Sequence, residues 1–137
     1  MCVTETDFIW RKLPKLSDDP IIKDLMRYHD RNIKGVYIIK TDFRHGRVKG
    51  ECDILYIGQG WLDERLICFT DLSEEHKGWR HTARKRFKGY IEQFPRAEVK
   101  FGYKTCRTPE EAKELEKKLI SECVTNHLEA PPFNHQS

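Results

Sequence analysis

Two short apolar segments, each with one tyrosine, constrain the fold of this chain more than any other feature. They are residues 35–39 and 55–58, both rich in β-branched side chains and each with a glycine at one end. Such residues favour strands, and a single connecting loop favours antiparallel pairing. Because side chains alternate across a strand, we expect Tyr37 and Tyr56 to point into one pocket.

The composition limits the class of protein. The chain has 137 residues, enough for one domain. It has no apolar run long enough to span a membrane and no signal-peptide pattern at the N-terminus, so we expect no membrane partner. Five scattered cysteines without a C-x-x-C pair indicate reduced thiols in a cytoplasmic protein, or a nuclear one in a eukaryote, with a structural zinc site as the minor alternative.

Local signals divide the chain into an extension and a domain. Residues 1–34 are predicted to be an N-terminal extension with one helix, which begins at Pro20 and could cap the core or mediate self-association into a homo-oligomer. Residues 35–137 are predicted to form a single α/β domain of the α+β type. We expect a small three-stranded, mainly antiparallel sheet flanked by helices.

Periodicity and capping signals place the elements of this domain. The expected strands are residues 35–41, 53–58 and 98–104, with a long basic hairpin loop at residues 42–50. The expected helices are residues 62–70, 75–90 and 108–124. The last helix has the clearest start, because Thr108 and Glu111 form a capping box and Pro109 takes the first helical position.

Two charged residues fall on apolar helix faces. At about 100° per residue, Glu116 lies between Leu119 and Ile120 in angle, and Arg65 lies beside the apolar stripe of its own helix. A lone carboxylate that faces a core costs several kcal/mol unless a cation, a metal or hydrogen-bond donors meet it. Glu116 and Arg65 could pair with each other, or they could join the tyrosines in a polar pocket.

The helix at residues 75–90 is expected to carry a stripe of cations on its outer face. Charge of a single sign favours contact with a phosphate backbone, because a merely solvated face usually mixes signs. The predicted nucleic-acid contacts are Lys77, Arg80, Arg84 and Lys88, with Arg44 and Arg47 from the hairpin loop. Arg86 turns back toward the inner face and is not part of the stripe.

Taken in order, these residues resemble the GIY-YIG nuclease superfamily. The resemblance covers about residues 33–135. Its motif positions are Gly35-Val36-Tyr37, Tyr56-Ile57-Gly58, Arg65, Glu116 and Asn134.

The resemblance implies metal-dependent hydrolysis of DNA phosphodiesters by a single-metal mechanism. Glu116 would hold Mg²⁺ or Mn²⁺, and Arg65 would contact the phosphate oxygens. Tyr37 would orient or deprotonate the attacking water with Tyr56 beside it, and His76 is a fifth catalytic candidate. In supporting roles, Gly35 and Gly58 belong to the motifs, and Asn134 is expected to fix the Glu116 helix or a strand.

The chain also departs from the family pattern. Phe69 stands where many members carry histidine or tyrosine, so His76 or His81 would have to take that role, and Gln59 stands where lysine is common. These departures leave open a catalytically inactive nucleic-acid-binding module of the same fold. An unrelated small domain that binds a protein partner, with Glu116 and Arg65 as an internal ion pair, is the third reading.

Overall fold

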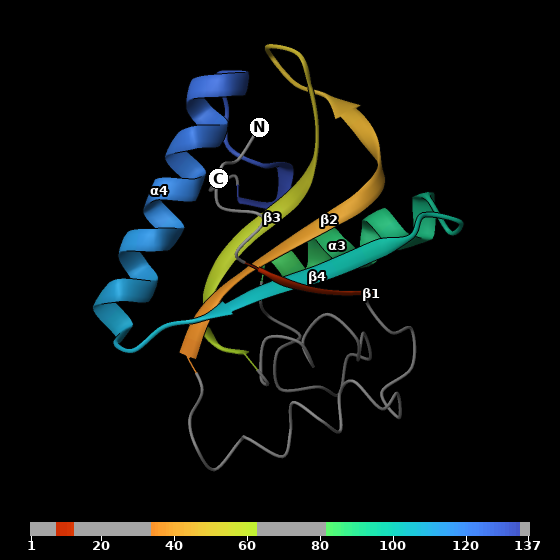
Figure 1. The fold of residues 1–137 in the computed structure, drawn as a ribbon. Coiled ribbons are helices and arrows are strands. Elements are labelled where there is room, and N and C mark those ends of the chain that lie inside the picture. Colours follow the sequence, from red (N-terminus) through yellow and green to blue (C-terminus); the bar gives the residue numbers. More distant parts are fainter. Residues whose placement is uncertain (1–7, 13–33, 63–81, 135–137) are drawn as a thin grey trace.

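The computed structural model describes residues 8–12, 34–62 and 82–134. These residues form an α+β fold built on an antiparallel sheet of four strands in the order β1-β4-β2-β3 (Figure 1). The strands are β1 (Ile9–Lys12), β2 (Lys34–Gly46), β3 (Glu51–Trp61) and β4 (Val99–Thr105). The prediction of three strands is therefore wrong, because the extension contributes a fourth.

Strand β1 comes from the segment that was expected to lie outside the domain. It pairs antiparallel with β4, with Trp10 opposite Gly102. A side chain at Gly102 would collide with the Trp10 ring, since a Cβ there would lie 2.6 Å from it. Phe8, just before β1, is buried. Phe8 and Trp10 thus pack on the domain, whereas Ile9 is exposed. The helix predicted from Pro20 lies outside the described residues.

The β2–β3 hairpin is longer than its sequence suggested. Its strands continue to Gly46 and resume at Glu51, so the loop expected at residues 42–50 is reduced to residues 47–50. Cross-strand pairs such as His45 with Cys52 stabilise this polar part of the ribbon. The register also shifts at Leu55, since Ile39 pairs with Tyr56 while Lys40 pairs with Ile54. This bulge places Leu55 in the same cluster as Tyr56.

Three helical elements are described, namely α3 (Thr82–Gln93), α4 (Pro109–His127) and the 3-10 turn η3 (Pro132–Asn134). Thr108 is confirmed as the N-cap of α4, because the Glu111 N–H donates to Thr108 Oγ1 over 3.1 Å. The helix ends at Leu128, which adopts the left-handed conformation. The predicted helix at residues 62–70 and the start of the next one lie outside the described residues, apart from Leu62. No helix in the described part of the chain is long and apolar enough to cross a membrane.

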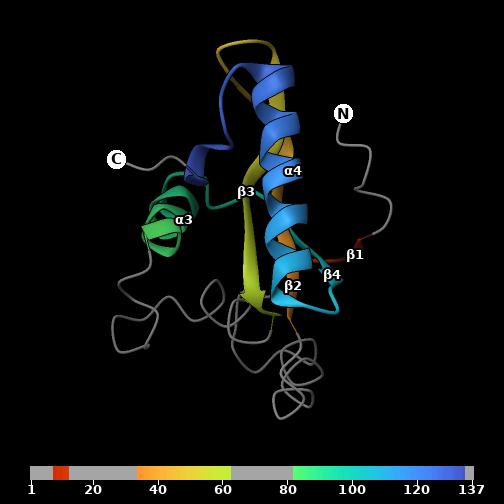
Figure 2. The same cartoon turned by 90° about the vertical axis from the view of Figure 1, so that its left-hand side faces the viewer.

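The helices cover opposite faces of the sheet (Figures 1 and 2). Helix α3 and η3 pack on the face that carries Tyr37, here called the tyrosine face, and α4 packs on the other, here called the α4 face. Buried residues of the tyrosine face include Tyr37, Ile39, Leu62, Phe87, Tyr90, Phe101 and Phe133. Those of the α4 face include Val36, Ile38, Ile54, Ile57, Ala112, Leu119 and Cys123. Residues 36–39 are buried throughout because both faces are covered.

Candidate active site

The two motif tyrosines lie side by side on one face of the sheet. Their ring centroids are 5.7 Å apart with the planes tilted by 48°. The register explains this contact, because Tyr37 is opposite Gly58 on β3 and Tyr56 is opposite Ile39 on β2. Both phenols therefore project from the tyrosine face, diagonally across a strand pair, as the alternation in the sequence predicted.

Gly58 provides the space in which the two rings meet. A Cβ at this position would lie 2.5 Å from Tyr37 Oη and 2.7 Å from Tyr56 Cε2. The hydroxyl of Tyr37 thus lies over the backbone of β3. Gly35 is constrained in a similar way, because a Cβ there would collide with the carbonyl oxygen of Lys104 on β4. Both motif glycines are required by close approach of neighbouring atoms.

The tyrosines differ in their exposure. Tyr37 is 1% exposed and stacks on Phe101, with centroids 5.3 Å apart and planes 13° from parallel. Tyr56 is only half-buried at the edge of the same cluster. Tyr103 is directly opposite Tyr37 on β4 and is also half-buried. No motif in the sequence marks Tyr103, and strand register alone brings it to this face.

Asn134 fixes the backbone between Tyr56 and Gly58. The Ile57 N–H donates to Asn134 Oδ1 over 2.8 Å, and Asn134 Nδ2 donates to the Ile57 carbonyl over 2.6 Å. Because β3 is the outer strand of the sheet, these two backbone groups face away from β2. The side-chain amide pairs with them as a neighbouring strand would. Asn134 thus holds the outer edge of β3 at Ile57 through two hydrogen bonds.

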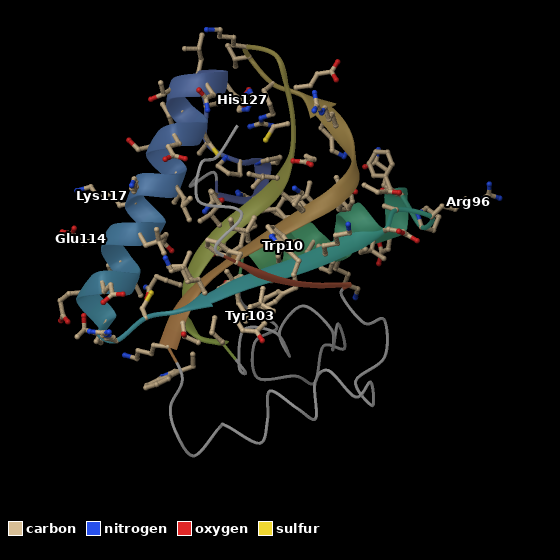
Figure 3. The ribbon with its side chains drawn as sticks, in the orientation of Figure 1. Trp10, Arg96, Tyr103, Glu114, Lys117 and His127 are labelled. Atoms are coloured by element: carbon tan, nitrogen blue, oxygen red, sulfur yellow. The ribbon has the colours of Figure 1, made fainter. Side chains whose placement is uncertain are left out.

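Glu116 occupies a half-buried position on α4. Its helix packs on the α4 face through Ala112, Leu119 and Cys123, whereas the tyrosines belong to the opposite face. Glu114 and Lys117, by contrast, project away from the sheet (Figure 3). A meeting of Glu116 with the tyrosine pair would take place around the outer edge of β3, and it stays a prediction. Arg65 and His76 lie outside the described residues.

The oxygen donors of Glu116 are of the kind that Mg²⁺ or Mn²⁺ accepts. Within the described ranges, no three His, Cys, Asp or Glu side chains gather at one point. Mg²⁺ usually binds one or two carboxylates and retains several waters. A single half-buried glutamate is therefore compatible with such an ion by donor chemistry.

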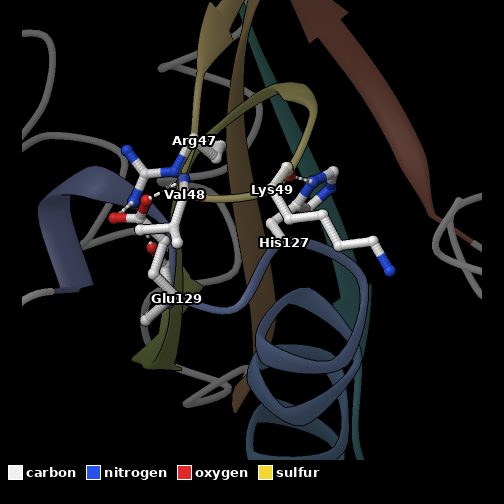
Figure 4. A network of polar contacts seen from close by, with 6 residues as sticks. Arg47, Val48, Lys49, His127 and Glu129 are labelled. Carbon is white, nitrogen blue, oxygen red and sulfur yellow. Dashed lines mark hydrogen bonds and ion pairs between the residues drawn. The ribbon is translucent and has the colours of Figure 1, made fainter.

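Arg47 has a structural role that the sequence did not reveal. Its guanidinium pairs with the Glu129 carboxylate and donates to the Ala130 carbonyl, and its side chain is only 13% exposed (Figure 4). The Val48 N–H donates to the other oxygen of Glu129. The Lys49 N–H donates to the His127 carbonyl, and the Lys49 carbonyl lies 3.0 Å from His127 Nδ1. These contacts, here called the hairpin latch, join the tip of the β2–β3 hairpin to the end of α4. They leave Arg47 poorly placed for the phosphate contact predicted from its charge.

The remaining predicted nucleic-acid contacts are spread over two elements. Arg44 is exposed on β2, Lys88 is half-buried on α3, and Arg84 belongs to α3. Lys77 and Arg80 lie outside the described residues. Arg86 turns inward as expected, and its Nη1 donates to the Phe133 carbonyl over 3.4 Å.

A second polar chain crosses the far end of the tyrosine face. Tyr90 Oη lies 2.7 Å from His45 Nε2 and donates to Thr41 Oγ1 over 3.1 Å. Burial raises the pKa of Tyr90, and the nearby Asp42 carboxylate adds to this effect, while the hydrogen bond with Thr41 opposes it. No local pattern in the sequence indicates this chain, because Tyr90 follows Thr41 and His45 by more than 40 positions.

Comparisons with known proteins add no relatives to this picture. No protein-family model, no curated protein and no solved structure matches the chain.

Proposed function

We propose that the protein is a metal-dependent endonuclease that hydrolyses DNA phosphodiester bonds in the manner of the GIY-YIG nucleases. The contact of Tyr37 and Tyr56 over Gly58 carries this proposal. The two rings meet over Gly58, which lies opposite Tyr37, and Asn134 holds Ile57 between Tyr56 and Gly58. This arrangement supports the resemblance found in the sequence. The tyrosine contact thus explains why Tyr37, Tyr56 and Gly58 occur together in the motif.

Each side chain has a chemical role in this proposal. Tyr37 would orient or deprotonate the attacking water, with Tyr56 beside it. A free phenol has a pKa near 10 and is a weak base unless nearby cations lower that value. Arg65 would supply such a cation and contact two phosphate oxygens at once. His76 would be available for proton transfer.

Glu116 would hold a Mg²⁺ or Mn²⁺ ion. Such an ion supplies charge stabilisation at the phosphate when it is bound. Helix α4, which is capped at its start by Thr108, would hold this carboxylate in a fixed position. The DNA itself would be held by Arg44, Arg84 and Lys88, together with Lys77 and Arg80.

One observation favours an inactive nucleic-acid-binding module as the second candidate. Tyr37 is almost completely buried and stacked on Phe101, so its hydroxyl has little access to solvent. In such a module the tyrosine pair would be part of the core. The basic residues would then bind DNA without cleaving it.

Supercoiled plasmid separates these functions. We expect nicking with Mg²⁺, none with EDTA, and loss of nicking in Glu116→Ala. Glu114→Ala is the matched control, because Glu114 is an exposed carboxylate two positions away on the same helix. Plasmid that is retarded in a gel but remains intact would support the binding module. Plasmid that is neither cleaved nor retarded at low salt would overturn both.

A further inference from the structure

A pocket lies where α3 ends and β4 begins, at the far end of the sheet from Gly35. The pocket is open to solvent, and its volume is about 530 Å³. It is lined by Asp42, Gln93, Phe94, Pro95, Arg96 and Ala97. None of these residues belongs to the candidate active site.

Asp42 presents a fixed carboxylate to this pocket. Its Oδ1 accepts from the Glu98 N–H over 3.2 Å and from Thr41 Oγ1 over 3.3 Å. Within the described part of the chain, Oδ2 receives no hydrogen bond. One oxygen therefore holds the side chain in place, and the other is available to a donor on a ligand.

Arg96 and Phe94 supply the other two kinds of contact. Arg96 is exposed and extends away from the α3–β4 turn (Figure 3), and across residues 8–12, 34–62 and 82–134 it has no ion-pair partner. It does not pair with Asp42, although both line the pocket. The Phe94 ring is held by Tyr90 at 4.8 Å and by His45 at 5.6 Å between centroids. The pocket thus combines an acceptor, a fixed aromatic ring and an unpaired guanidinium.

We propose that this pocket binds one unpaired nucleotide of the DNA substrate. A base with an exocyclic amino group could donate to Asp42 and stack on Phe94. Its phosphate would meet the guanidinium of Arg96. A base inside a duplex could still donate to Asp42 from the major groove, but it could not stack on Phe94, because both of its faces are covered by neighbouring bases. This inference rests on the proposed function and specifies its substrate as DNA with a single-stranded part.

The pocket lies a fixed distance along β2 from the tyrosine pair. Asp42 follows Tyr37 by five residues, a strand length of about 17 Å. The pocket would therefore read a base at a fixed distance from the tyrosine pair.

Binding without cleavage tests the proposal, with EDTA present throughout. The probes are a blunt duplex and the same duplex with a ten-nucleotide single-stranded extension that carries 2-aminopurine, whose fluorescence falls when it stacks. We expect tighter binding of the extended DNA and quenching of the probe. Arg96→Ala and Asp42→Asn should each reduce this preference about five- to hundredfold, the range expected for one stacked or hydrogen-bonded base.

Arg107→Ala is the charge-matched control, because Arg107 is exposed and lies beyond β4. Equal affinity of the wild-type protein for the two DNAs would overturn the proposal. An equal loss of preference in Arg107→Ala and Arg96→Ala would also overturn it, since general charge would then explain the binding. Failure of the nuclease proposal would appear separately, as an absence of plasmid nicking with Mg²⁺ in a protein that still prefers the extended DNA.

Discussion

Asn134 and Ile57 are joined by two hydrogen bonds that make a side chain act as the neighbour of an outer strand. Both polar backbone groups of Ile57 are satisfied by the one amide, over 2.8 and 2.6 Å. Ile57 lies between the motif residues Tyr56 and Gly58, and its own side chain is buried on the α4 face. The end of the chain therefore sets the geometry of the tyrosine pair from the opposite edge of β3.

Replacement of Asn134 should weaken both stability and cleavage. In Asn134→Ala both hydrogen bonds are lost, and we expect the free energy of unfolding to fall by about 1–3 kcal/mol. Asn134→Asp retains an acceptor for the Ile57 N–H but places a carboxylate oxygen against the Ile57 carbonyl, so it should destabilise at least as much as Asn134→Ala. Urea denaturation measures the loss of stability, amide exchange at Ile57 measures the loss of its hydrogen bond, and plasmid nicking measures the loss of cleavage. The control is Asn126→Ala on α4, and an equal loss there would contradict the role given to Asn134.

A side chain at position 58 should separate the two tyrosines. In Gly58→Ala the new Cβ would meet Tyr37 Oη and Tyr56 Cε2 at 2.5 and 2.7 Å, so the rings must move. We expect a stability loss of about 1–3 kcal/mol and loss of plasmid nicking. Gly46→Ala is the strand control, because nothing lies within 4 Å of its Cβ. Unchanged nicking in Gly58→Ala would argue against a role for the ring contact.

Arg44 and Arg47 should behave differently although they are three positions apart. Arg47→Ala breaks the hairpin latch, so we expect a loss of about 1–3 kcal/mol in stability. Arg44→Ala removes an exposed cation, so it should leave stability unchanged and weaken DNA binding. The slope of log affinity against log salt should fall by about one unit in Arg44→Ala only. If Arg47→Ala instead weakened DNA binding and left stability unchanged, the hairpin latch would not form in solution.

Alkaline pH should destabilise the protein through Tyr90. Because burial raises its pKa in the folded state, Tyr90 stabilises the fold fully below the unfolded value of about 10. This contribution is lost as the pH rises through the folded pKa, since the unfolded chain then releases the proton more readily. Tyr90→Phe should flatten the decline in unfolding free energy above about pH 10. Its cost at neutral pH should be about 1–3 kcal/mol, because buried Thr41 loses its donor. An unchanged alkaline decline in Tyr90→Phe would contradict this assignment.

Local signals predicted the parts of the fold that depend on neighbouring residues. The antiparallel pairing of the tyrosine strands, the shared face of Tyr37 and Tyr56, and the capping of α4 by Thr108 all follow from short-range patterns. The inward turn of Arg86 likewise follows from helical periodicity.

The features that were missed depend on long-range contacts. Strand β1 is only four residues long, and its pairing with β4 about 90 positions later has no local signal. Arg47 and Glu129 are 82 positions apart, so charge alone suggested a DNA contact where the fold makes an ion pair. The apolar stripe of α4 was read correctly, but the face of the sheet that it covers could not be read from the helix itself.

The central claim is that the tyrosine pair is the reaction site, and single-turnover cleavage of DNA by phenylalanine variants tests it most directly. Tyr103 is the matched control, because it is a half-buried tyrosine opposite Tyr37 on the same face. We predict that Tyr37→Phe and Tyr56→Phe each slow cleavage by about 10²-fold or more with DNA affinity retained, while Tyr103→Phe cleaves at close to the wild-type rate. Equal rates in all three variants would contradict the claim.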